Sequence, residues 1–270
     1  MQYSQAQKIV ETTWERIRPS FCQNTSTSRH HSWEKSDDAS LVALEEYFWG
    51  SASRFALLIT KTAQYLPPGA KVLDAGAGSG VFAAALKTAG FEAHASDLHQ
   101  GLAIFEQESI PYQPWNLEAE SAPYDNDSFD AVILSQTIEH FTYSPLKPLM
   151  EIHRIVRPGG IVIIDAPNIS CFRNISRLMR GKSLHWDLKT HYLEQIPETI
   201  HNIPYYDRHN HEYSKDDLIN IAEHFGTRIE ELAYYSSYNQ KKYNFFTVLA
   251  SHIRDSIKRW RKGIYAVYRQ

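Results

Sequence analysis

The sequence predicts an α/β fold built on parallel strands that are joined by crossover helices. Two observations carry this prediction. Short apolar segments alternate with segments of helical periodicity between residues 71 and 167, which is typical of parallel strands with intervening helices. In addition, residues 129–135 (FDAVILS) are apolar on both faces, as expected for a central strand of a parallel sheet.

The predicted elements follow in chain order. Apolar residues recur at helical spacing over residues 2–18 and about 40–65, so two helices precede the first strand. The predicted strands are 71–76, 92–97, 110–115, 129–135 and 161–167, with helices at 79–89, about 99–106 and about 148–157 between them. The segment 214–226 is a further helix, with Ser214 as N-cap, Asp217 at the capping-box position and Gly226 as stop. Two last strands are predicted at about 227–234 and 244–250.

This pattern predicts five segments. They are an N-terminal helical extension at 1–66, a cofactor-binding core at 67–168, an insertion at 169–213, the end of the core sheet at 214–251 and a basic amphipathic C-terminal helix at 252–270. The last segment carries six Lys or Arg in residues 252–270 against one Asp. It is typical of a helix that docks on its own domain or on a second copy, or that contacts a membrane surface. We therefore expect a monomer or homodimer, with a possible peripheral membrane contact through 252–270.

The composition excludes several classes of protein. Of the 270 residues, 43% are hydrophobic and 22% are charged, as in a soluble globular protein. The net charge of -3 argues against a general nucleic-acid binder. The two cysteines do not suggest a disulfide framework or a zinc cluster. No segment reaches the roughly 18 apolar residues of a membrane span, and the start lacks a signal-peptide core, so a cytoplasmic protein is expected.

A glycine-rich turn follows the first predicted strand. The stretch VLDAGAGSG (72–80) places Gly76, Gly78 and Gly80 where the backbone must turn sharply and approach a ligand. Its spacing fits both a dinucleotide-binding GxGxxA turn and the pattern DxGxGxG. Asp74 at the end of the strand would repel a pyrophosphate and favour a ligand with an ammonium group. The turn is therefore typical of a nucleotide-type site, and Asp74 favours a ligand that bears an ammonium group over a dinucleotide.

Four motifs in this order resemble a known family. They are VLDAGAGSG, the acid that ends ASDL, SFDAVILSQTIEHF and RIVRPGGIVIIDAPN. Together they resemble the class I S-adenosylmethionine-dependent methyltransferases, in the group of small-molecule enzymes of ubiquinone-biosynthesis type. The resemblance covers about residues 45–168 and, more loosely, 210–250. It implies a Rossmann-like, seven-stranded mixed sheet with helices on both faces, S-adenosylmethionine as cofactor and S-adenosylhomocysteine as product.

The resemblance also implies roles for residues around the cofactor. The turn at Gly76, Gly78 and Gly80 passes under the methionine portion, and Asp74 supports the turn or meets the amino group through water. Asp97 takes both ribose hydroxyls, unless it is a helix N-cap, and Leu98 packs on the adenine face.

Further cofactor positions lie later and earlier in the chain. Asn116, followed by Leu117, occupies the place of the usual Asp that accepts from the adenine amino group, although Asn116 could be a turn residue. Ser135 and Gln136 lie near the cofactor mostly through their backbone. Arg54 either pairs with the methionine carboxylate or is a surface arginine.

Three residues are candidates for proton transfer. His140 is the first candidate base, because imidazole titrates near neutral pH, although a packing histidine is an equal alternative. Glu139 could orient a base or join a metal site, but there is no fuller acidic cluster, so no metal is predicted. His211 is a second candidate base, while the pair His209 and His211 is interpreted as polar residues of the insertion.

The insertion is expected to hold the acceptor. Residues 183–214 are rich in aromatic residues and histidines, and long structured loops are more often functional than idle. Such residues suit a sugar, a phenol or a heteroaromatic ring. We expect methyl transfer to a small or carrier-linked acceptor, first at the oxygen of a sugar or natural-product hydroxyl. N-methylation, or a non-catalytic module that binds the cofactor and scaffolds a partner, is the alternative.

Overall fold

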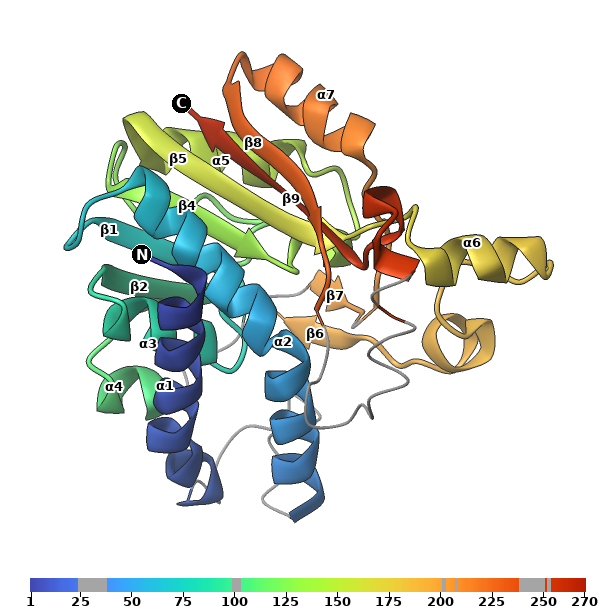
Figure 1. The fold of residues 1–270 in the computed structure, drawn as a ribbon, viewed down its shortest axis with the longest axis horizontal. Coiled ribbons are helices and arrows are strands. Elements are labelled where there is room, and N and C mark those ends of the chain that lie inside the picture. The colour runs from blue at the N-terminus through green and yellow to red at the C-terminus, as the bar shows by residue number, and fades with distance from the viewer. Residues whose placement is uncertain (24–37, 99–102, 201–202, 207, 238–250, 252–253) are drawn as a thin grey trace. The chain divides into compact units, whose positions relative to one another are not determined.

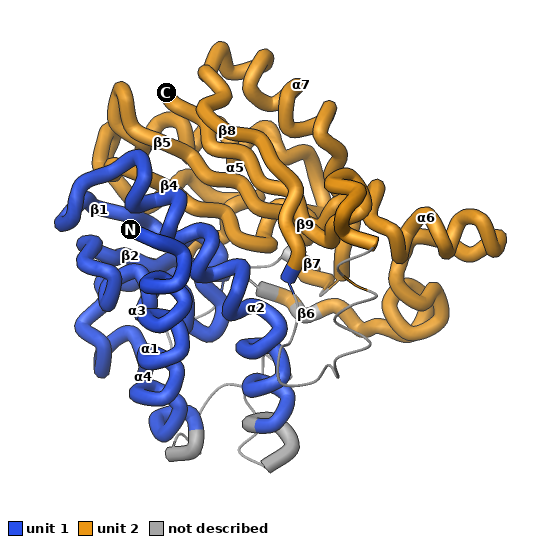
Figure 2. Tube along the Cα trace, viewed as in Figure 1, with its two compact units in different colours: residues 1–114, 237–244 blue, residues 115–236, 245–270 orange. Residues whose placement is uncertain are grey.

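The computed structural model describes residues 1–23, 38–98, 103–200, 203–206, 208–237, 251 and 254–270 (Figure 1). The chain divides into two compact units (Figure 2). The first unit comprises residues 1–114 and 237–244, and the second comprises residues 115–236 and 245–270. The predicted boundaries of the five segments remain a prediction.

The first unit begins with two long helices, as the sequence predicts. Helix α1 (Tyr3–Gln23) packs on α2 (Asp38–Tyr65). The buried ring of Trp14 stacks on Phe48, with 4.5 Å between their centroids. Stacked aromatic rings of this size bury a large apolar area, so this pair anchors the N-terminal helices to each other.

The rest of the first unit alternates strands and helices. Its elements are β1 (Lys71–Ala75), α3 (Val81–Thr88), β2 (Glu92–Asp97), α4 (Ala103–Gln107) and β3 (Tyr112–Pro114). The pairs β1–β2 and β2–β3 are parallel. Helix α3 is buried over six consecutive residues, Val81 to Leu86, which explains its almost wholly apolar sequence.

The second unit carries the remaining strands. Its elements are β4 (Phe129–Ser135), η1 (Ile138–His140), α5 (Leu146–Ile155), β5 (Val156–Pro167), α6 (Phe172–Met179), η2 (Lys189–Leu193), β6 (Glu198–Ile200), β7 (Ile203–Tyr205), α7 (Lys215–Phe225), β8 (Arg228–Tyr235), η3 (Lys258–Trp260) and β9 (Gly263–Arg269). Strand β4 pairs parallel with β5, whereas β9 is antiparallel to both β5 and β8. The start of α7 has the predicted capping box, because Ser214 Oγ accepts from Asp217 N at 3.2 Å and Ser214 N donates to Asp217 Oδ2 at 2.7 Å.

The main sheet has seven strands in the order β3-β2-β1-β4-β5-β9-β8. Its parallel and antiparallel pairs confirm the predicted seven-stranded mixed sheet of an α/β fold. The insertion after β5, for which the sequence indicates no clear strand, contains the antiparallel pair β6–β7. No helix in the described ranges is long and apolar enough to cross a membrane.

The helix predicted over residues 252–270 is wrong. Residues Gly263–Arg269 form β9, which lies between β5 and β8 and is buried along almost its whole length. A strand that is buried on both faces has no polar alternation, so periodicity does not distinguish it from a helix. Ile264 and Val267, two apolar residues of this segment, are fully buried in the sheet. The strand predicted at 244–250 lies outside the described residues.

Candidate active site

The glycine turn between β1 and α3 has the backbone that its sequence predicts. The φ angles of Gly76, Gly78 and Gly80 are 85°, 50° and 78°, all in the left-handed region. The backbone N–H groups of Gly76 and Ala77 donate to the carbonyl of Ser96, at 2.8 and 3.0 Å. The turn is thereby fixed to the end of β2, and the N-terminus of α3 follows it directly.

Asp97 closes the turn from the end of β2. Its Oδ2 accepts from the backbone N–H of Gly78 at 2.8 Å, and its Oδ1 accepts from that of Leu98 at 2.7 Å. The N–H groups that an N-cap at this position would meet, two and three residues later, lie outside the described residues. The structure therefore places this carboxylate and the half-buried Leu98 beside the glycine turn, and their contacts with ribose and adenine stay predictions.

Asp74 lies in β1 on the other side of this turn. Its side chain is 1% exposed and accepts from the backbone N–H of Ala83. Burial, and then the negative charge of Asp97, raise the pKa of Asp74 to about 8, although Arg54 acts in the opposite direction. A carboxyl group with this pKa changes its charge readily when a cationic ligand binds nearby.

Arg54 in α2 is buried, so the interpretation as a surface arginine is wrong. It is 4% exposed, and it donates to Ser51 Oγ at 3.0 Å and to Tyr47 OH at 3.3 Å. Its guanidinium also lies 5.0 Å from the ring centroid of Phe55. A buried guanidinium that influences Asp74 is a fitting partner for a ligand carboxylate, and this role stays a prediction.

Alanine substitutions at two glycines of the turn are expected to have different effects. A Cβ on Gly80 would lie 2.9 Å from Ile104 Cγ2 and would also meet left-handed strain, so Gly80→Ala should lower the free energy of unfolding by about 2–5 kcal/mol. A Cβ on Gly78 meets no atom within 4 Å, so Gly78→Ala should cost only about 1–2 kcal/mol of left-handed strain. The Gly78 variant should nevertheless lose affinity for the cofactor, because its methyl group projects into open space at the turn.

Urea unfolding and calorimetric titration with S-adenosylmethionine measure these two effects separately. An unchanged affinity in a folded Gly78→Ala variant would contradict a ligand-facing turn.

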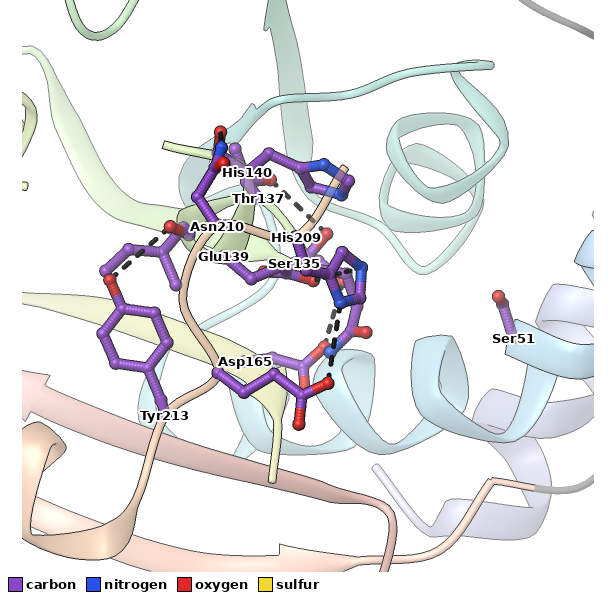
Figure 3. A network of polar contacts seen from close by, with 12 residues as sticks. Ser51, Ser135, Thr137, Glu139, His140, Asp165, His209, Asn210 and Tyr213 are labelled. Atoms are coloured by element: carbon purple, nitrogen blue, oxygen red, sulfur yellow. Dashed lines mark hydrogen bonds and ion pairs between the residues drawn. The ribbon is translucent and has the colours of Figure 1, made fainter. Parts of the chain in front are cut away.

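The exit of β4, in the second unit, is a strained backbone segment. Gln136 has a φ of 55°, and its N–H donates to the carbonyl of Asp165 at 2.9 Å. Ser135 Oγ lies 3.4 Å from Asp165 Oδ2, and Asp165 is fully buried (Figure 3). Sequence reasoning missed Asp165, although it has the signal that identified Asp74 and Asp97, an acid near the end of an apolar strand.

Glu139, His140 and His209 come together just after this exit (Figure 3). Glu139 in η1 is fully buried, and its Oε1 lies 4.0 Å from His209 Nε2. The rings of His140 and His209 are perpendicular, with 4.9 Å between their centroids. Asn210 holds the insertion here, because its N–H donates to the carbonyl of Glu139 at 2.8 Å and its Nδ2 to that of His140 at 3.0 Å.

His211 does not belong to this group. Its side chain is 57% exposed, and its Nε2 lies 3.9 Å from Asp217 Oδ2. Residues 209 and 211 would share one side of an extended segment, but the chain bends at Asn210 between them, so His209 faces Glu139 and His211 does not. The structure thus places His209, to which the sequence gave no catalytic role, beside the candidate base His140.

Asn116 is held inside its own turn. Its Oδ1 accepts from the N–H groups of Glu118 and Ala119, at 3.1 and 3.3 Å, as in an Asx turn. An adenine contact through this oxygen would compete with those bonds, so the geometry favours the turn-residue interpretation. Leu117 beside it is 6% exposed, and its contact with the cofactor stays a prediction.

A cavity of about 300 Å³ lies in the insertion, within the second unit. Its wall is lined by Ile169, residues 183–186 and residues 209–212. The ring of Trp186 lies 4.7 Å from that of His209, centroid to centroid. His209 therefore belongs both to the cavity wall and to the group around Glu139.

The comparison with known families decides the class of the protein. A family model described as a methyltransferase domain matches residues 48–232, more than half of the chain. The chain belongs to the methyltransferase-domain family. It is thus a class I S-adenosylmethionine-dependent methyltransferase domain, with S-adenosylmethionine as cofactor, as the sequence motifs predict. The left-handed turn and the carboxylate of Asp97 beside it fit this nucleoside ligand.

One curated relative of this methyltransferase matches over part of its length. Demethylmenaquinone methyltransferase of Clavibacter sepedonicus is 32% identical over 100 residues, which cover 36% of this chain and 40% of that protein. The chain thus spans well under two thirds of this relative.

Two solved structures share the fold of this methyltransferase. One is a SAM-dependent methyltransferase from Archaeoglobus fulgidus, with a TM-score of 0.54 and 16% identity over 87% of this chain and all of that chain. The other is the 1,6-didemethyltoxoflavin-N1-methyltransferase of Burkholderia thailandensis, with its substrate and S-adenosylhomocysteine bound. Its TM-score is 0.53 at 16% identity, over 96% of this chain and 89% of that chain.

Proposed function

We propose that this methyltransferase transfers the methyl group of S-adenosylmethionine to a hydroxyl oxygen of a small or carrier-linked acceptor that binds in the cavity of the insertion. The cavity of about 300 Å³ carries this proposal, because it is bounded by His209, which faces Glu139 next to the candidate base His140. Cavities of this size with a few convergent polar groups are typical of small-molecule sites.

The cavity wall supports an acceptor with a ring. Trp186 and Leu184 provide apolar surface, whereas His185, His209 and Asn210 provide polar groups that can fix its orientation. An aromatic hydroxyl and a sugar hydroxyl both suit such a wall. The Clavibacter relative, whose name gives demethylmenaquinone as its substrate, supports the inclusion of quinone-type rings among the candidates.

The proposed chemistry is an in-line displacement at the methyl carbon. The acceptor oxygen attacks this carbon, the carbon–sulfur bond breaks, and its electron pair leaves with the sulfur of S-adenosylhomocysteine. Positioning of the two reactants contributes about 7–11 kcal/mol, against a typical 100- to 10,000-fold from a general base. His140 is the proposed base, and the buried carboxylate of Glu139 beside it favours the imidazolium that forms when the base takes the proton.

The test is methyl transfer from S-adenosylmethionine with a deuterated methyl group to a panel of phenols, quinols and sugars. We expect S-adenosylhomocysteine to form together with a product whose labelled methyl group is attached to oxygen. A product labelled only at nitrogen would replace this proposal by the N-methylation alternative. Binding of S-adenosylhomocysteine without transfer to any member of the panel would favour the non-catalytic module.

Removal of the aromatic wall should affect the acceptor and spare the cofactor. Loss of a ring contact costs about 1–3 kcal/mol, so Trp186→Ala should raise the KM of the acceptor by about 10-fold or more. The dissociation constant of S-adenosylmethionine should stay unchanged. Tyr143→Ala is the matched control, since Tyr143 is 60% exposed and does not line the cavity, and it should leave both constants unchanged.

Steady-state kinetics and calorimetric titration give the two constants. A KM that Trp186→Ala leaves unchanged would contradict acceptor binding in this cavity.

A further inference from the structure

We propose that the acceptor of this methyltransferase is a phosphorylated small molecule, whose phosphate group binds to Arg173 and Arg177 of α6 while the rest of it lies in the cavity of the insertion. This substrate class rests on the proposed function, because it requires an acceptor in that cavity. Binding of phosphate at α6 does not itself depend on methyl transfer, so it can be tested separately.

Both arginines contact the wall of the cavity. Arg177 donates from Nε to the carbonyl of Ser183 at 2.7 Å and from Nη2 to that of His185 at 3.5 Å. Arg173 Nη2 lies 3.6 Å from Glu212 Oε1. Because Ser183, His185 and Glu212 all line the cavity, the two guanidinium groups lie beside the place proposed for the acceptor.

The spacing of the two arginines suits a phosphate group. Residues four positions apart are neighbours on the surface of a helix, so Arg173 and Arg177 share one side of α6. The side chain of Arg173 is 68% exposed, and its distance to Glu212 is too long for a hydrogen bond, so its N–H donors are accessible to a ligand. A phosphate group carries about 1.5 to 2 negative charges and three acceptor oxygens, which allows it to bind two guanidinium groups at once.

A second basic segment lies beside α6 (Figure 1). Residues 171–184 contain four basic residues and no acidic one, and residues 254–262 contain five basic residues and one Asp. The ring of Phe172 in α6 lies 5.5 Å from that of Trp260 in η3, centroid to centroid. Asn168 Nδ2 donates to two carbonyls of the second segment, each at 2.8 Å. The fold therefore gathers positive charge from two distant parts of the sequence at one end of the cavity wall.

The basic residues of the two segments repel one another. Partial burial, and then the positive charges of Arg254 and Arg173, lower the pKa of Lys262, although Asp255 acts in the opposite direction. Arg173 of α6 is thus close enough to the second segment to disfavour a further positive charge there. A bound phosphate would offset this repulsion, because its negative charge attracts all three cations. The charge of this surface therefore complements an anionic acceptor.

The first test is calorimetric titration of the full chain with pyrophosphate. We expect saturable binding that weakens as salt is added. Arg173→Gln and Arg177→Gln should each weaken it by about 10- to 100-fold, because each variant loses charge-assisted hydrogen bonds to the phosphate. Arg180→Gln is the matched control on the same helix, because Arg180 donates to the carbonyl of Ser176 in α6, and it should change the affinity by about twofold at most.

The outcomes of this titration separate a phosphate site from general attraction to a basic surface. Absence of pyrophosphate binding in the wild type, or the same loss of affinity in Arg180→Gln as in Arg173→Gln, would overturn the proposal. The side chain of Arg173 is exposed, so its variant should fold, and its thermal unfolding temperature verifies this. Binding to vesicles of phosphatidylglycerol and phosphatidylcholine without binding of pyrophosphate would assign the surface to a membrane and overturn the proposal as well.

The second test compares methyl transfer to phosphorylated and unphosphorylated forms of the same sugars and phenols. We expect the phosphorylated form to have a KM lower by about tenfold or more, and Arg173→Gln to abolish this difference while kcat stays unchanged. Transfer to hydroxyl groups without preference for phosphorylated acceptors would overturn this inference and leave the proposed function in place. Binding of pyrophosphate by a chain that methylates no hydroxyl would refute the proposed function and leave the phosphate site in place.

Discussion

Replacement of Asp97 by alanine is expected to weaken the binding of S-adenosylmethionine by about 100- to 10,000-fold. Hydrogen bonds to a charged group are worth about 1.5–3 kcal/mol each, and the carboxylate is predicted to accept two from the ribose hydroxyls. Asp97 also accepts from the N–H groups of Gly78 and Leu98, at 2.8 and 2.7 Å. Its loss therefore removes ligand contacts and one of the bonds that hold the glycine turn.

Two further variants separate these contributions. Asp97→Asn keeps one acceptor oxygen for the turn and should fall between the wild type and Asp97→Ala. Glu92→Ala is the matched control on the same strand, because Glu92 is exposed at the opposite end of β2, and it should bind like the wild type. Calorimetric titration with S-adenosylmethionine and S-adenosylhomocysteine gives the affinities, and thermal unfolding shows that each variant folds. Wild-type affinity in a folded Asp97→Ala variant would exclude the ribose contact.

The cofactor half of the fold could be predicted from the sequence because its signals are local. Glycines at alternate positions require left-handed backbone, and Gly76, Gly78 and Gly80 have it. An acid at the end of a buried strand is visible as a change of polarity within a few residues, as at Asp74 and Asp97. The alternation of strands and helices then fixes which strand ends share an edge of a parallel sheet.

The group around Glu139 could not be predicted in the same way. It forms where the insertion returns to η1 and is held there by the bonds of Asn210 to the carbonyls of Glu139 and His140. No local pattern specifies that return. Spacing alone paired His209 with His211, because an extended segment would place both on one side, whereas the chain bends at Asn210 and turns the two rings in different directions.

The last strand shows a different limit of sequence reasoning. Side chains on both faces of β9 are mostly apolar, because β9 lies between β5 and β8 and is buried on both faces. Basic residues lie just before β9 in the sequence. Taken together with the apolar residues of β9, they suggest a charged amphipathic helix. Whether this segment forms a helix or a strand depends on the arrangement of the whole sheet, because a strand here must pair with both β5 and β8.

Binding of S-adenosylmethionine near pH 7 is expected to release a proton from Asp74. Burial and the charge of Asp97 raise the pKa of Asp74 to about 8, so its carboxyl group is mostly protonated at pH 7 in the free protein. The ammonium and sulfonium charges of the ligand favour the carboxylate and lower this pKa. The affinity should therefore rise with pH, by at most tenfold per pH unit, and level off above about pH 8.

The same shift predicts how the stability of the free protein depends on pH. The unfolded chain has an Asp pKa of about 3.9, so between about pH 4 and pH 8 the folded protein binds more protons than the unfolded chain. The stabilisation is fully present below about pH 4, and the free energy of unfolding decreases by up to about 1.4 kcal/mol per pH unit until about pH 8. Asp74→Asn removes the buried charge, and it should abolish this slope and stabilise the free protein at pH 9.

Two measurements decide whether Asp74 carries this proton. Calorimetric titration at pH 7 in buffers of different ionisation enthalpy should show net proton release in the wild type and none in Asp74→Asn. Urea unfolding from pH 4 to pH 9 should show a steeper decrease of stability in the wild type than in that variant. Asp125→Asn, at an exposed aspartate, is the control and should behave like the wild type. Proton release that persists in Asp74→Asn would assign the proton to another group and remove the ammonium-binding role of this carboxylate.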